Sequence, residues 1–498
     1  MTLPCLQPEA ADVTVLGIDL GTSSVKVVVG RLDGSVAGQA TGDYPVASPR
    51  PGWSETSPAD WLAATAAAVR SAVAQAGADP AAIGLSGQMH GVVPTTADGR
   101  PIRAAMLWSD ARALGELQPY RRLPADVRAR LANPLSPGMA GPLLAWLAAN
   151  EPIAYAATRW ALQPKDWLRA QLTGEFATEP SDASATLLYD VAGDVWDAGV
   201  LDALGLDPAK LPPILPRSAE CAGTLTAEAA TLLGLRPGIP VAAGAADTAA
   251  AALGSGLIEP GTMQLTIGTG IQIIRPVAAL PEPAPADPVT HLYRAATDTG
   301  WYRMGAVLNG GLTLSWVCRT LGASWQQLYA AAAIAPRADD PYFLPHLNGE
   351  RTPYLDPGLR AAWTDLGPRH DRPHLLRAAL EGVAFAVRDA LEHVVEPGAP
   401  IAQLRLAGGG TVDPGWRQML ADILGHALAP VEVPAASALG AVLLGARAAK
   451  LTDRPAFDPR PAAAPAPTIP QQDKAEFYRV RHQAFRRKIQ ALRATDSG

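Results

Sequence analysis

Residues 13–34 read VTVLGIDLGTSSVKVVVGRLDG, and this stretch predicts three consecutive strands joined by two turns. Val13–Ile18 is a short apolar run, and Val25–Val29 is a second run, rich in the β-branched residues that favour strands. Asp33-Gly34 is typical of a hairpin turn, so a third strand is expected over Ser35–Thr41. The chain therefore opens with an antiparallel meander rather than with a strand–helix–strand unit.

A helix is expected after the meander, over Pro58–Gln75. Ser57 and Asp60 have the spacing of a capping box, and Pro58 suits the first helical position. Apolar side chains then recur at helical spacing, at Trp61, Ala64, Ala68, Ala72 and Val73.

A second turn of the same kind lies about 250 residues further along the chain. Thr262–Ile267 predicts a strand, Gly268-Thr269-Gly270 a tight turn and Ile271–Ile274 a second strand. Both turns follow closely after an isoleucine and carry the pair Gly-Thr. This internal similarity predicts two related lobes, joined near Gly256–Gly261.

The rest of the second half predicts helices and one further strand. The expected helices are Arg372–Val395, Asp413–His426 with Asp413 as its cap, Ser437–Lys450 and Asp473–Arg493, and the expected strand is Ile401–Ala407. Residues 454–469 are rich in proline and alanine and should be irregular. The terminal helix is expected to dock through Phe477, Val480, Phe485 and Leu492.

The composition excludes several classes of protein. A chain of 498 residues with 48% hydrophobic residues and a mean hydropathy of +0.07 can bury the cores of about two to four domains, which excludes wholesale disorder. A net charge of −6 argues against a general nucleic-acid-binding protein. Cys5, Cys221 and Cys318 are too widely spaced to predict a disulfide framework or a zinc site, and free thiols suit a reducing compartment.

Nothing in the sequence predicts export or membrane insertion. The first 20 residues contain three acidic residues and no lysine or arginine. The best membrane candidate, Val241–Ile258, is mostly alanine and glycine and carries Asp247, so a buried segment is expected there. We therefore expect a cytoplasmic protein with no membrane partner.

The two glycine turns are candidate phosphate sites. Around the first turn, Gly21 lets backbone N–H groups approach a phosphate, Thr22 and Ser23 add hydroxyl donors, and Asp19 at the strand end can hold Mg²⁺ directly or through water. An ordinary hairpin with a turn-capping aspartate would look the same. Repetition at Gly268-Thr269-Gly270 favours the functional interpretation, because two such turns facing each other across a cleft can grip a polyphosphate from both sides.

A third glycine cluster, Gly408-Gly409-Gly410, lies between the expected strand and the helix capped by Asp413. Backbone at such a turn can approach an adenine or a ribose closely, beside the positive end of a helix. A plain tight turn is the alternative.

A candidate sugar site follows the apolar run Ile83–Leu85. In Gly87-Gln88-Met89-His90-Gly91, the flanking glycines leave room for a ligand beside His90, whose imidazole could donate to a hydroxyl or a ketone. Trp108 offers a flat apolar face that suits the C–H face of a sugar. A structural histidine and a core tryptophan are the alternatives.

Asp247 is the candidate general base. It lies at or just inside the start of an expected helix, where the macrodipole favours an ionised carboxylate, while neighbouring phosphates would raise its basicity. A plain helix cap is the alternative. Three other polar clusters are interpreted as turns or solvated loops: Lys165-Asp166, Ser181-Asp182-Ala183 and Asn348–Thr352.

The ordered set of motifs resembles the FGGY carbohydrate kinases, and among them those that act on xylulose. The resemblance covers roughly Val13–Lys450, and the Gln-Met-His-Gly box is the piece that indicates xylulose among the family's sugars. The matching motifs are Gly17–Ser23, Gly87–Gly91, Trp108-Ser109-Asp110-x-Arg112, Pro164-Lys165-Asp166, Ser181-Asp182-Ala183, Asp247, Ile267-Gly268-Thr269, Phe343-Leu344-Pro345, Gly349–Pro353, Leu380–Val383, Gly408–Gly410 and Trp416–Asp422.

The resemblance implies an α/β, two-lobed, actin-like (ribonuclease H-like) fold with a mixed sheet in each lobe and a central cleft. The expected divisions are residues 13–260, 261–453 and a terminal segment 454–498. The resemblance also implies roles for single residues: Asp247 is the general base, Asp19 acts beside metal-bound phosphates, Met89 and His90 contact the sugar, the 268–270 turn holds phosphate and Gly408–Thr411 hold adenosine.

The implied function is ATP- and Mg²⁺-dependent phosphorylation of a ketopentose, D-xylulose. The resemblance also suggests a homodimer. Three positions depart from the family pattern: Thr248 replaces an asparagine, Leu143 a lysine and Asp365 a glycine. Thr248 keeps open a kinase for ribulose, another ketose or a polyol. An actin-like nucleotide-switched binding protein without turnover is the alternative from another class.

Overall fold

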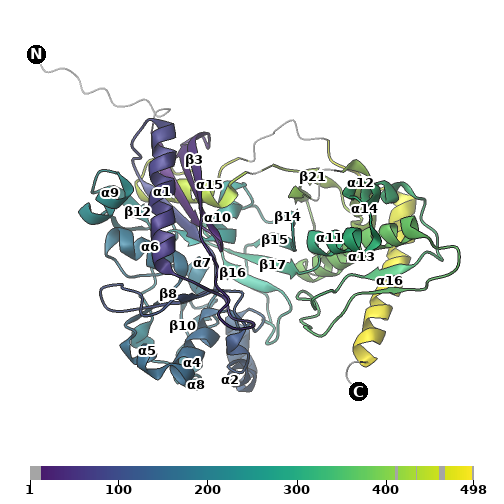
Figure 1. Ribbon diagram of the computed structural model, residues 1–498, viewed down its shortest axis with the longest axis horizontal. Helices are drawn as coiled ribbons and strands as arrows, with labels where there is room; N and C mark the ends of the chain where they lie inside the picture. Colours follow the sequence, from purple (N-terminus) through teal and green to yellow (C-terminus); the bar gives the residue numbers. More distant parts are fainter. Residues whose placement is uncertain (1–12, 397, 410–412, 433, 459–465, 496–498) are drawn as a thin grey trace, which may run out of the picture.

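The computed structural model describes residues 13–396, 398–409, 413–432, 434–458 and 466–495. Two α/β lobes lie side by side, the first in purple to teal and the second mainly in green to yellow (Figure 1). Residues 1–12 and two residues expected to bind the nucleotide, Gly410 and Thr411, lie outside the described residues.

The first lobe is built on a mixed sheet that begins with the predicted meander. Strands β1 (Thr14–Leu20), β2 (Ser24–Arg31) and β3 (Val36–Asp43) pair antiparallel. Strand β5 (Ile83–Gly87) then pairs parallel with β1, and β12 (Pro240–Ala242) and β13 (Ala245–Ala246) pair parallel with β5. Strand β11 (Cys221–Thr224) closes the edge antiparallel to β12.

The second sheet repeats this pattern of strand directions. Its central strands are β14 (Thr262–Ile267), β15 (Ile271–Val277), β17 (Trp301–Val307) and β20 (Gln403–Ala407), with β16 (His291–Arg294) and β21 (Leu428–Pro430) at the two edges. The series β17–β15–β14–β20–β21 has the same antiparallel and parallel steps as β3–β2–β1–β5–β12. The prediction of two related lobes, each with a mixed sheet, is confirmed.

Helix α1 (Pro58–Ala76) packs on β2 and β3, close to its predicted bounds. The capping-box prediction is wrong, since the side chain of Ser57 makes no capping hydrogen bond and the residue contributes only its carbonyl to the N–H of Asp60. In the second lobe, Asp413 does cap α14 (Pro414–Leu424), accepting from the N–H of Trp416 at 2.8 Å.

Other helices that the following sections use are α6 (Pro164–Thr173), α10 (Asp247–Gly254), α11 (Gly311–Leu321), α13 (Arg372–Val394), α15 (Ala436–Ala448) and α16 (Gln472–Thr495). Further helices are α2 (Leu117–Arg122), α3 (Ala125–Leu131), α4 (Ala140–Asn150), α5 (Pro152–Ala157), α7 (Pro180–Ala183), α8 (Ala198–Ala203), α9 (Ala227–Leu233) and α12 (Trp325–Ala330). The remaining short strands are β4 (Glu55–Thr56), β6 (Val93–Thr95), β7 (Ala105–Met106), β8 (Trp160–Leu162), β9 (Tyr189–Asp190), β10 (Val195–Trp196), β18 (Tyr342–Leu344) and β19 (Ala362–Thr364).

Helix α15 follows the second sheet in sequence but packs on the first sheet and on α10 (Figure 1). Glycines make this contact very close: a Cβ atom on Gly84 of β5 would lie 1.7 Å from the carbonyl oxygen of Ala441. A Cβ on Gly440 would lie 1.9 Å from the carbonyl of Ala250 in α10. The helix that carries Asp247 at its start is therefore wedged directly against α15.

The terminal helix α16 docks on α13, α14 and β18, as expected, through buried Tyr478, Phe485 and Ile489. Phe477 and Leu492 pack partly buried against the same core. Val480 does not dock: 54% of it is exposed, because it lies on the opposite face of the helix.

The alanine-rich stretch 241–258 contains β12, β13 and α10 and is part of the first lobe. Within the part of the chain that the structure describes, no helix is both long enough and apolar enough to span a membrane. Cys221 is exposed and Cys318 buried, and both are free thiols.

Candidate active site

The two candidate carboxylates lie at the carboxyl ends of β1 and β13, the parallel strands on either side of β5. Asp19 pairs in register with Ser86 of β5, while Ala246 on the other side of β5 pairs with Gly87. Asp247 follows directly and is the first residue of α10. Since adjacent strands lie about 4.8 Å apart, the strands that carry the two carboxylates are separated by roughly 10 Å.

The two carboxylates influence each other electrostatically. Burial is the main cause of the raised pKa of Asp19, and a hydrogen bond from the Ser86 hydroxyl (2.7 Å) and the charge of Lys26 offset part of it. Burial and then the charge of Asp19 raise the pKa of Asp247 to about 7. Thr248 partly opposes this rise, because its N–H (2.5 Å) and hydroxyl (3.0 Å) both donate to Oδ1 of Asp247. Asp247 is only partly buried, so a reactant can reach it.

Hydrogen bonds from the side chains of Gln88 and Tyr44 hold the first glycine turn in place. The N–H of Gly21 donates to the carbonyl of Ser24 across the turn, and the carbonyl of Gly21 accepts from Gln88 Nε2 (2.9 Å) and from the Tyr44 hydroxyl (2.7 Å). Ser23 is exposed, and the hydroxyl of Thr22 accepts from the indole of Trp108 at 2.9 Å. Trp108 therefore lies against this turn.

The second glycine turn is held by the start of α11. The N–H groups of Gly311 and Leu312 donate to the carbonyls of Gly268 (2.9 Å) and Thr269 (3.0 Å). Gly268 and Thr269 are exposed, and Gly270 closes the turn by accepting from the N–H of Gly268. The turn is thus available to a ligand and fixed in shape.

The third glycine cluster lies beside the second turn, because β20 runs parallel to β14 up to Ala407, which pairs with Thr266. Gly408 has φ +93°, and a Cβ there would lie 2.3 Å from the carbonyl of Ile267, so this position requires glycine. Gly409 is exposed with open space where a side chain would be.

The surroundings of His90 favour a different hydrogen-bonding role from the donor role considered for it. Its Nδ1 lies 2.7 Å from the carbonyl of Ala185, to which it must donate, and burial, with help from the charge of Arg351, lowers the pKa of His90 to about 4. The ring is therefore neutral near pH 7, and its Nε2 carries a lone pair. His90 would accept a hydrogen bond from a hydroxyl rather than donate one. Its φ of +76° and partial exposure present it at the end of β5.

Met89 is more buried than His90. Only 5% of it is exposed, it packs in the core cluster that contains Ala185 and Ala249, and the hydroxyl of Tyr302 reaches its sulfur at 3.9 Å.

Two side chains that the sequence did not single out reach this region from the second half of the chain. Tyr293 of β16 lies with its ring centre 6.0 Å from that of His90, and its hydroxyl is 2.7 Å from His291 Nδ1. Arg351, in the loop between β18 and β19, has its guanidinium carbon 5.7 Å from the ring centre of Trp108, and burial lowers its pKa. The strand pattern of β16 gives no hint of Tyr293, whereas Arg351 lies in the motif Gly349–Pro353, within a stretch whose polar residues suggest only a loop.

The carboxylate pair fits a divalent cation. Carboxylate oxygens are preferred ligands of Mg²⁺, and Asp19 stands partly exposed at a strand end beside the exposed glycine turn. The charge of Asp19 raises the pKa of Asp247, which means that the negative potential here is not fully compensated by Lys26. A bound cation would relieve it.

Comparison with known proteins decides the family. Residues 14–254 match the N-terminal domain of the FGGY family of carbohydrate kinases, and residues 263–449 match its C-terminal domain. The chain belongs to the FGGY carbohydrate kinases. The xylulose kinase of Escherichia coli (strain K12) is similar to this FGGY kinase, with 34% identity over 485 residues, which is 96% of this chain and 99% of that protein.

Solved structures of other kinases have the same fold as this FGGY kinase. A xyloylose kinase from Brucella ovis superposes with a TM-score of 0.89 at 34% identity, covering 97% of this chain and 100% of that one. A xylulose kinase from Rhodospirillum rubrum gives a TM-score of 0.86 at 29% identity over 97% and 98% of the two chains. The expected two-lobed sugar-kinase fold is confirmed.

Two departures from the FGGY pattern have a structural explanation. Asp365 has φ +61°, a left-handed conformation that glycine favours and aspartate tolerates, and its carboxylate pairs with Lys488 at 2.7 Å. Leu143 is fully buried in α4, where a lysine would need a partner for its charge.

For two of the polar clusters, the interpretation as turns or solvated loops is wrong. Lys165-Asp166 and Ser181-Asp182 are not solvated, because all four residues are fully buried beneath Asp247 in the first lobe. An isolated Lys-Asp or Ser-Asp pair gives no sequence signal that distinguishes a buried network from a turn.

Proposed function

We propose that this FGGY kinase transfers the γ-phosphoryl group of ATP to the C5 hydroxyl of D-xylulose, with Asp247 as general base. The observation that carries the proposal is the carboxyl of Asp247 at the end of β13, partly exposed beside Asp19 and with a pKa raised to about 7. A base with that pKa is poised to accept a proton near neutral pH. The choice of sugar is supported by the relatives named xylulose kinase and by the Gln88-Met89-His90 box.

In the proposed step, an oxygen–phosphorus bond forms while another breaks. Asp247 takes the hydroxyl proton of the sugar as that oxygen bonds to the γ-phosphorus. The bond from the γ-phosphorus to its bridging oxygen breaks, and the electron pair leaves with ADP. A positioned base contributes about 10²–10⁴-fold to such a step. Alignment of the two reactants and stabilisation of charge supply the rest.

The three glycine clusters would hold ATP. The turn residues Gly21–Ser23 and Gly268–Gly270 would place backbone N–H and hydroxyl donors at the phosphates, and Gly408-Gly409 with Gly410 and Thr411 would hold the adenosine. Asp19 would hold Mg²⁺, and that ion would supply neutralisation of negative charge at the phosphates.

The sugar would lie among side chains from both halves of the chain. His90 Nε2 would accept from one hydroxyl, Arg351 would donate to an oxygen, and the face of Trp108 would cover C–H groups. Buried Met89, which contacts Tyr302, would form part of the wall of the sugar pocket.

A different ketose or polyol remains the second candidate because of Thr248. Its hydroxyl is engaged with Oδ1 of Asp247 at 3.0 Å, so it does not offer the sugar the amide that the usual asparagine would. Loss of such a contact can change which sugar is preferred.

A panel of sugars tests the choice of substrate. Purified protein with ATP and Mg²⁺ is assayed for ADP release with D-xylulose, ribulose, other ketoses and polyols. D-Xylulose should have the highest kcat/KM, by a large factor. Preference for ribulose or a polyol would select the second candidate, and ATP binding without turnover of any sugar would favour a nucleotide-switched binding protein.

The Asp247→Ala variant tests the base. It should bind sugar and ATP but lose turnover by about 10² or more. Asp60→Ala is the matched control, because Asp60 also lies in the first turn of a helix but on α1, outside this site. Near-normal turnover of Asp247→Ala would refute the assignment.

A further inference from the structure

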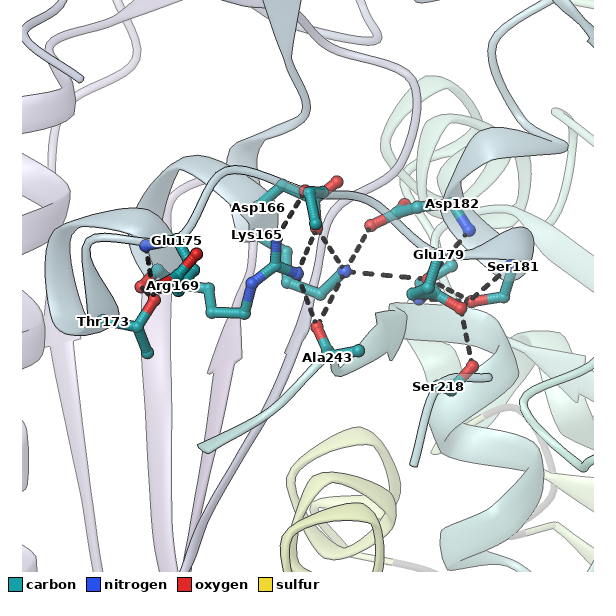
Figure 2. Close-up of polar contacts among 12 residues, drawn as sticks. Lys165, Asp166, Arg169, Thr173, Glu175, Glu179, Ser181, Asp182, Ser218 and Ala243 are labelled. Carbon is teal, nitrogen blue, oxygen red and sulfur yellow. Dashed lines mark hydrogen bonds and ion pairs between the residues drawn. The ribbon is translucent and has the colours of Figure 1, made fainter. Parts of the chain in front are cut away.

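The buried clusters form one ionic network beneath the start of α10, and Figure 2 shows it converging on the ammonium group of Lys165. Lys165 Nζ lies 2.7 Å from Asp166, 3.3 Å from Asp182 and 3.6 Å from Glu179. Arg169, one turn further along α6, pairs with Asp166 at 2.8 Å. All five side chains are fully buried, an arrangement that costs stability unless the charges are fully partnered.

The network grips one short backbone segment, Ala243–Ala246. The carbonyl of Ala243 accepts from Lys165 Nζ (3.2 Å) and from Arg169 Nη1 (2.9 Å) (Figure 2). The N–H of Ala246 donates to the hydroxyl of Ser181 (3.0 Å), which in turn donates to Glu179 Oε1 (2.7 Å). Both ends of the segment are therefore fixed by the same network, and the next residue is Asp247.

Glu179 is itself locked in place. Its carboxylate accepts from the N–H groups of Ser181 and Asp182 at the start of α7, and from the hydroxyl of Ser218 at 2.6 Å. Ser218 also accepts, through its carbonyl, from the N–H of Gly244 in the gripped segment.

Gly244, within the segment Ala243–Ala246, packs closely against β5 and Lys165. It has φ +84°, and a Cβ there would lie 2.6 Å from the carbonyl of Leu85 and 3.0 Å from Cδ of Lys165. The segment therefore lies against both β5 and the stem of Lys165, with no space for a side chain at Gly244.

Lys165 is held in its charged form by the carboxyl groups around it. Burial alone would lower the pKa of Lys165, but Asp166, Asp182 and Glu179 outweigh it and raise this pKa. Burial raises the pKa of Asp182 well above its usual range, and the charge of Lys165 opposes this rise. The two cations, Lys165 and Arg169, thus lie among the carboxyl groups of Asp166, Glu179 and Asp182.

We propose that this network positions the carboxylate of Asp247, with Lys165 and Ser181 as positioning residues that act through the backbone of Ala243 and Ala246. The inference rests on the proposed function, in which Asp247 is the base. A network that only stabilised the first lobe would not need to hold both ends of the four residues before that base.

Two variants test the proposal. Ser181→Ala removes the acceptor of the Ala246 N–H with little change of volume, and Lys165→Met removes the central charge. Since small misplacements of a reacting group are costly, Ser181→Ala should lower kcat about 10-fold and Lys165→Met about 100-fold, with KM for sugar and ATP changed less than about twofold. Thr173→Ala is the control, because Thr173 is a buried hydroxyl on α6 that bonds to the carbonyl of Arg169 and not to the gripped segment. It should keep wild-type kcat.

Combination with Asp247→Ala separates positioning from general destabilisation. If Ser181 acts through the base, Ser181→Ala should cause no further loss of kcat in the Asp247→Ala background. An undiminished further loss, or wild-type kcat in Ser181→Ala itself, would overturn the positioning role. If Lys165→Met does not fold by circular dichroism, the Ser181→Ala pair still decides. Near-normal turnover of Asp247→Ala alone would instead overturn the proposed base, so the two failures are distinguishable.

Discussion

Asp247 carries a carboxyl on which two effects act in the same direction. Burial and the nearby charge of Asp19 both raise its pKa, to about 7, and the hydrogen bonds from Thr248 oppose them only in part. The same burial would make an isolated carboxylate costly, so the residue pays in stability for its basicity.

Turnover should depend on pH through this carboxyl. Because only the ionised form accepts a proton, kcat/KM for the sugar should fall about tenfold for each pH unit below about 7. A pH–rate profile from pH 5 to pH 9 measures this. In Thr248→Val, which lacks the hydroxyl hydrogen bond to Oδ1, the acidic limb should move to higher pH. An activity that stays flat from pH 5 to pH 8 would contradict the assignment.

The same shift predicts a pH-dependent gain of stability in Asp247→Asn. The pKa of Asp247 is higher in the folded state than in the unfolded state. Ionisation of Asp247 therefore costs the wild type no stability below pH 3.8, and the wild type loses stability as the pH rises through about 7. A shift from 3.8 to about 7 corresponds to at most ~4 kcal/mol. Urea unfolding should therefore show Asp247→Asn more stable than the wild type at pH 8, with a smaller difference at pH 5. A difference that does not change with pH would count against the raised pKa of Asp247.

At the scale of elements, the first lobe depends on backbone contact between α15 and the sheet. Gly84 and Gly17 face α15, and a Cβ on Gly17 would lie 2.2 Å from the carbonyl of Ala438. The nearest atoms are backbone atoms of α15, which cannot move aside as a flexible side chain could.

Gly84→Ala should accordingly destabilise the protein by about 3 kcal/mol, since the new methyl meets the backbone of Ala441 and of Gly445. Chemical denaturation followed by circular dichroism measures the loss. Gly115→Ala is the control, because Gly115 has helical dihedral angles and a Cβ added there would meet no atom within 4 Å, so the change should be near neutral. Equal stability of the two variants would show that α15 is not packed this closely.

The sequence predicted the elements that local pattern controls. The β-branched runs placed β1, β2, β14 and β15 within a few residues, and the Gly-Thr turns revealed the repeat. The capping box at Ser57 failed because a side chain that can cap need not do so once the proline fixes the entry of the helix. The exposure of Val480 was missed because a long basic helix has more apolar residues than its docking face uses.

The site was predictable only where motif and chemistry coincide in the sequence. Asp19, Asp247 and the two turns carry such motifs, and the structure brings Asp19 and Asp247 to the same end of the sheet, on either side of β5. Arg351 and Tyr293 reach His90 only through the packing of distant elements, which no local pattern encodes. The sequence could not indicate which ring nitrogen of His90 is free for a ligand, because the carbonyl of Ala185, which binds Nδ1, is 95 residues away.

At the scale of the whole molecule, Asn133 joins the two halves. Its Nδ2 donates to the carbonyls of Leu131, Ser184 and Leu292, and its Oδ1 accepts from the N–H of Leu292. Leu292 belongs to β16 of the second sheet, whose neighbouring residue Tyr293 lies beside His90.

Asn133→Ala should therefore weaken both the fold and sugar binding. The buried N–H of Leu292 loses its partner, which costs about 1–3 kcal/mol. Displacement of β16 should raise KM for the sugar several-fold while KM for ATP stays unchanged, as steady-state kinetics would measure. Asn150→Ala, at an exposed residue bonded only to its own helix, is the control. A parallel rise in both KM values would contradict a local effect on the sugar pocket.

The place of α15 has a consequence for biosynthesis. Strands β1–β5 leave the ribosome hundreds of residues before Ala436–Ala448, the helix that covers one face of their sheet. Until α15 has been synthesised, that apolar face of the first lobe stays exposed, and we therefore expect chaperones to bind the nascent chain. A premature stop codon anywhere ahead of α15 leaves the amino-terminal product without its cover, and such a product should aggregate rather than survive as an independent sugar-binding fragment.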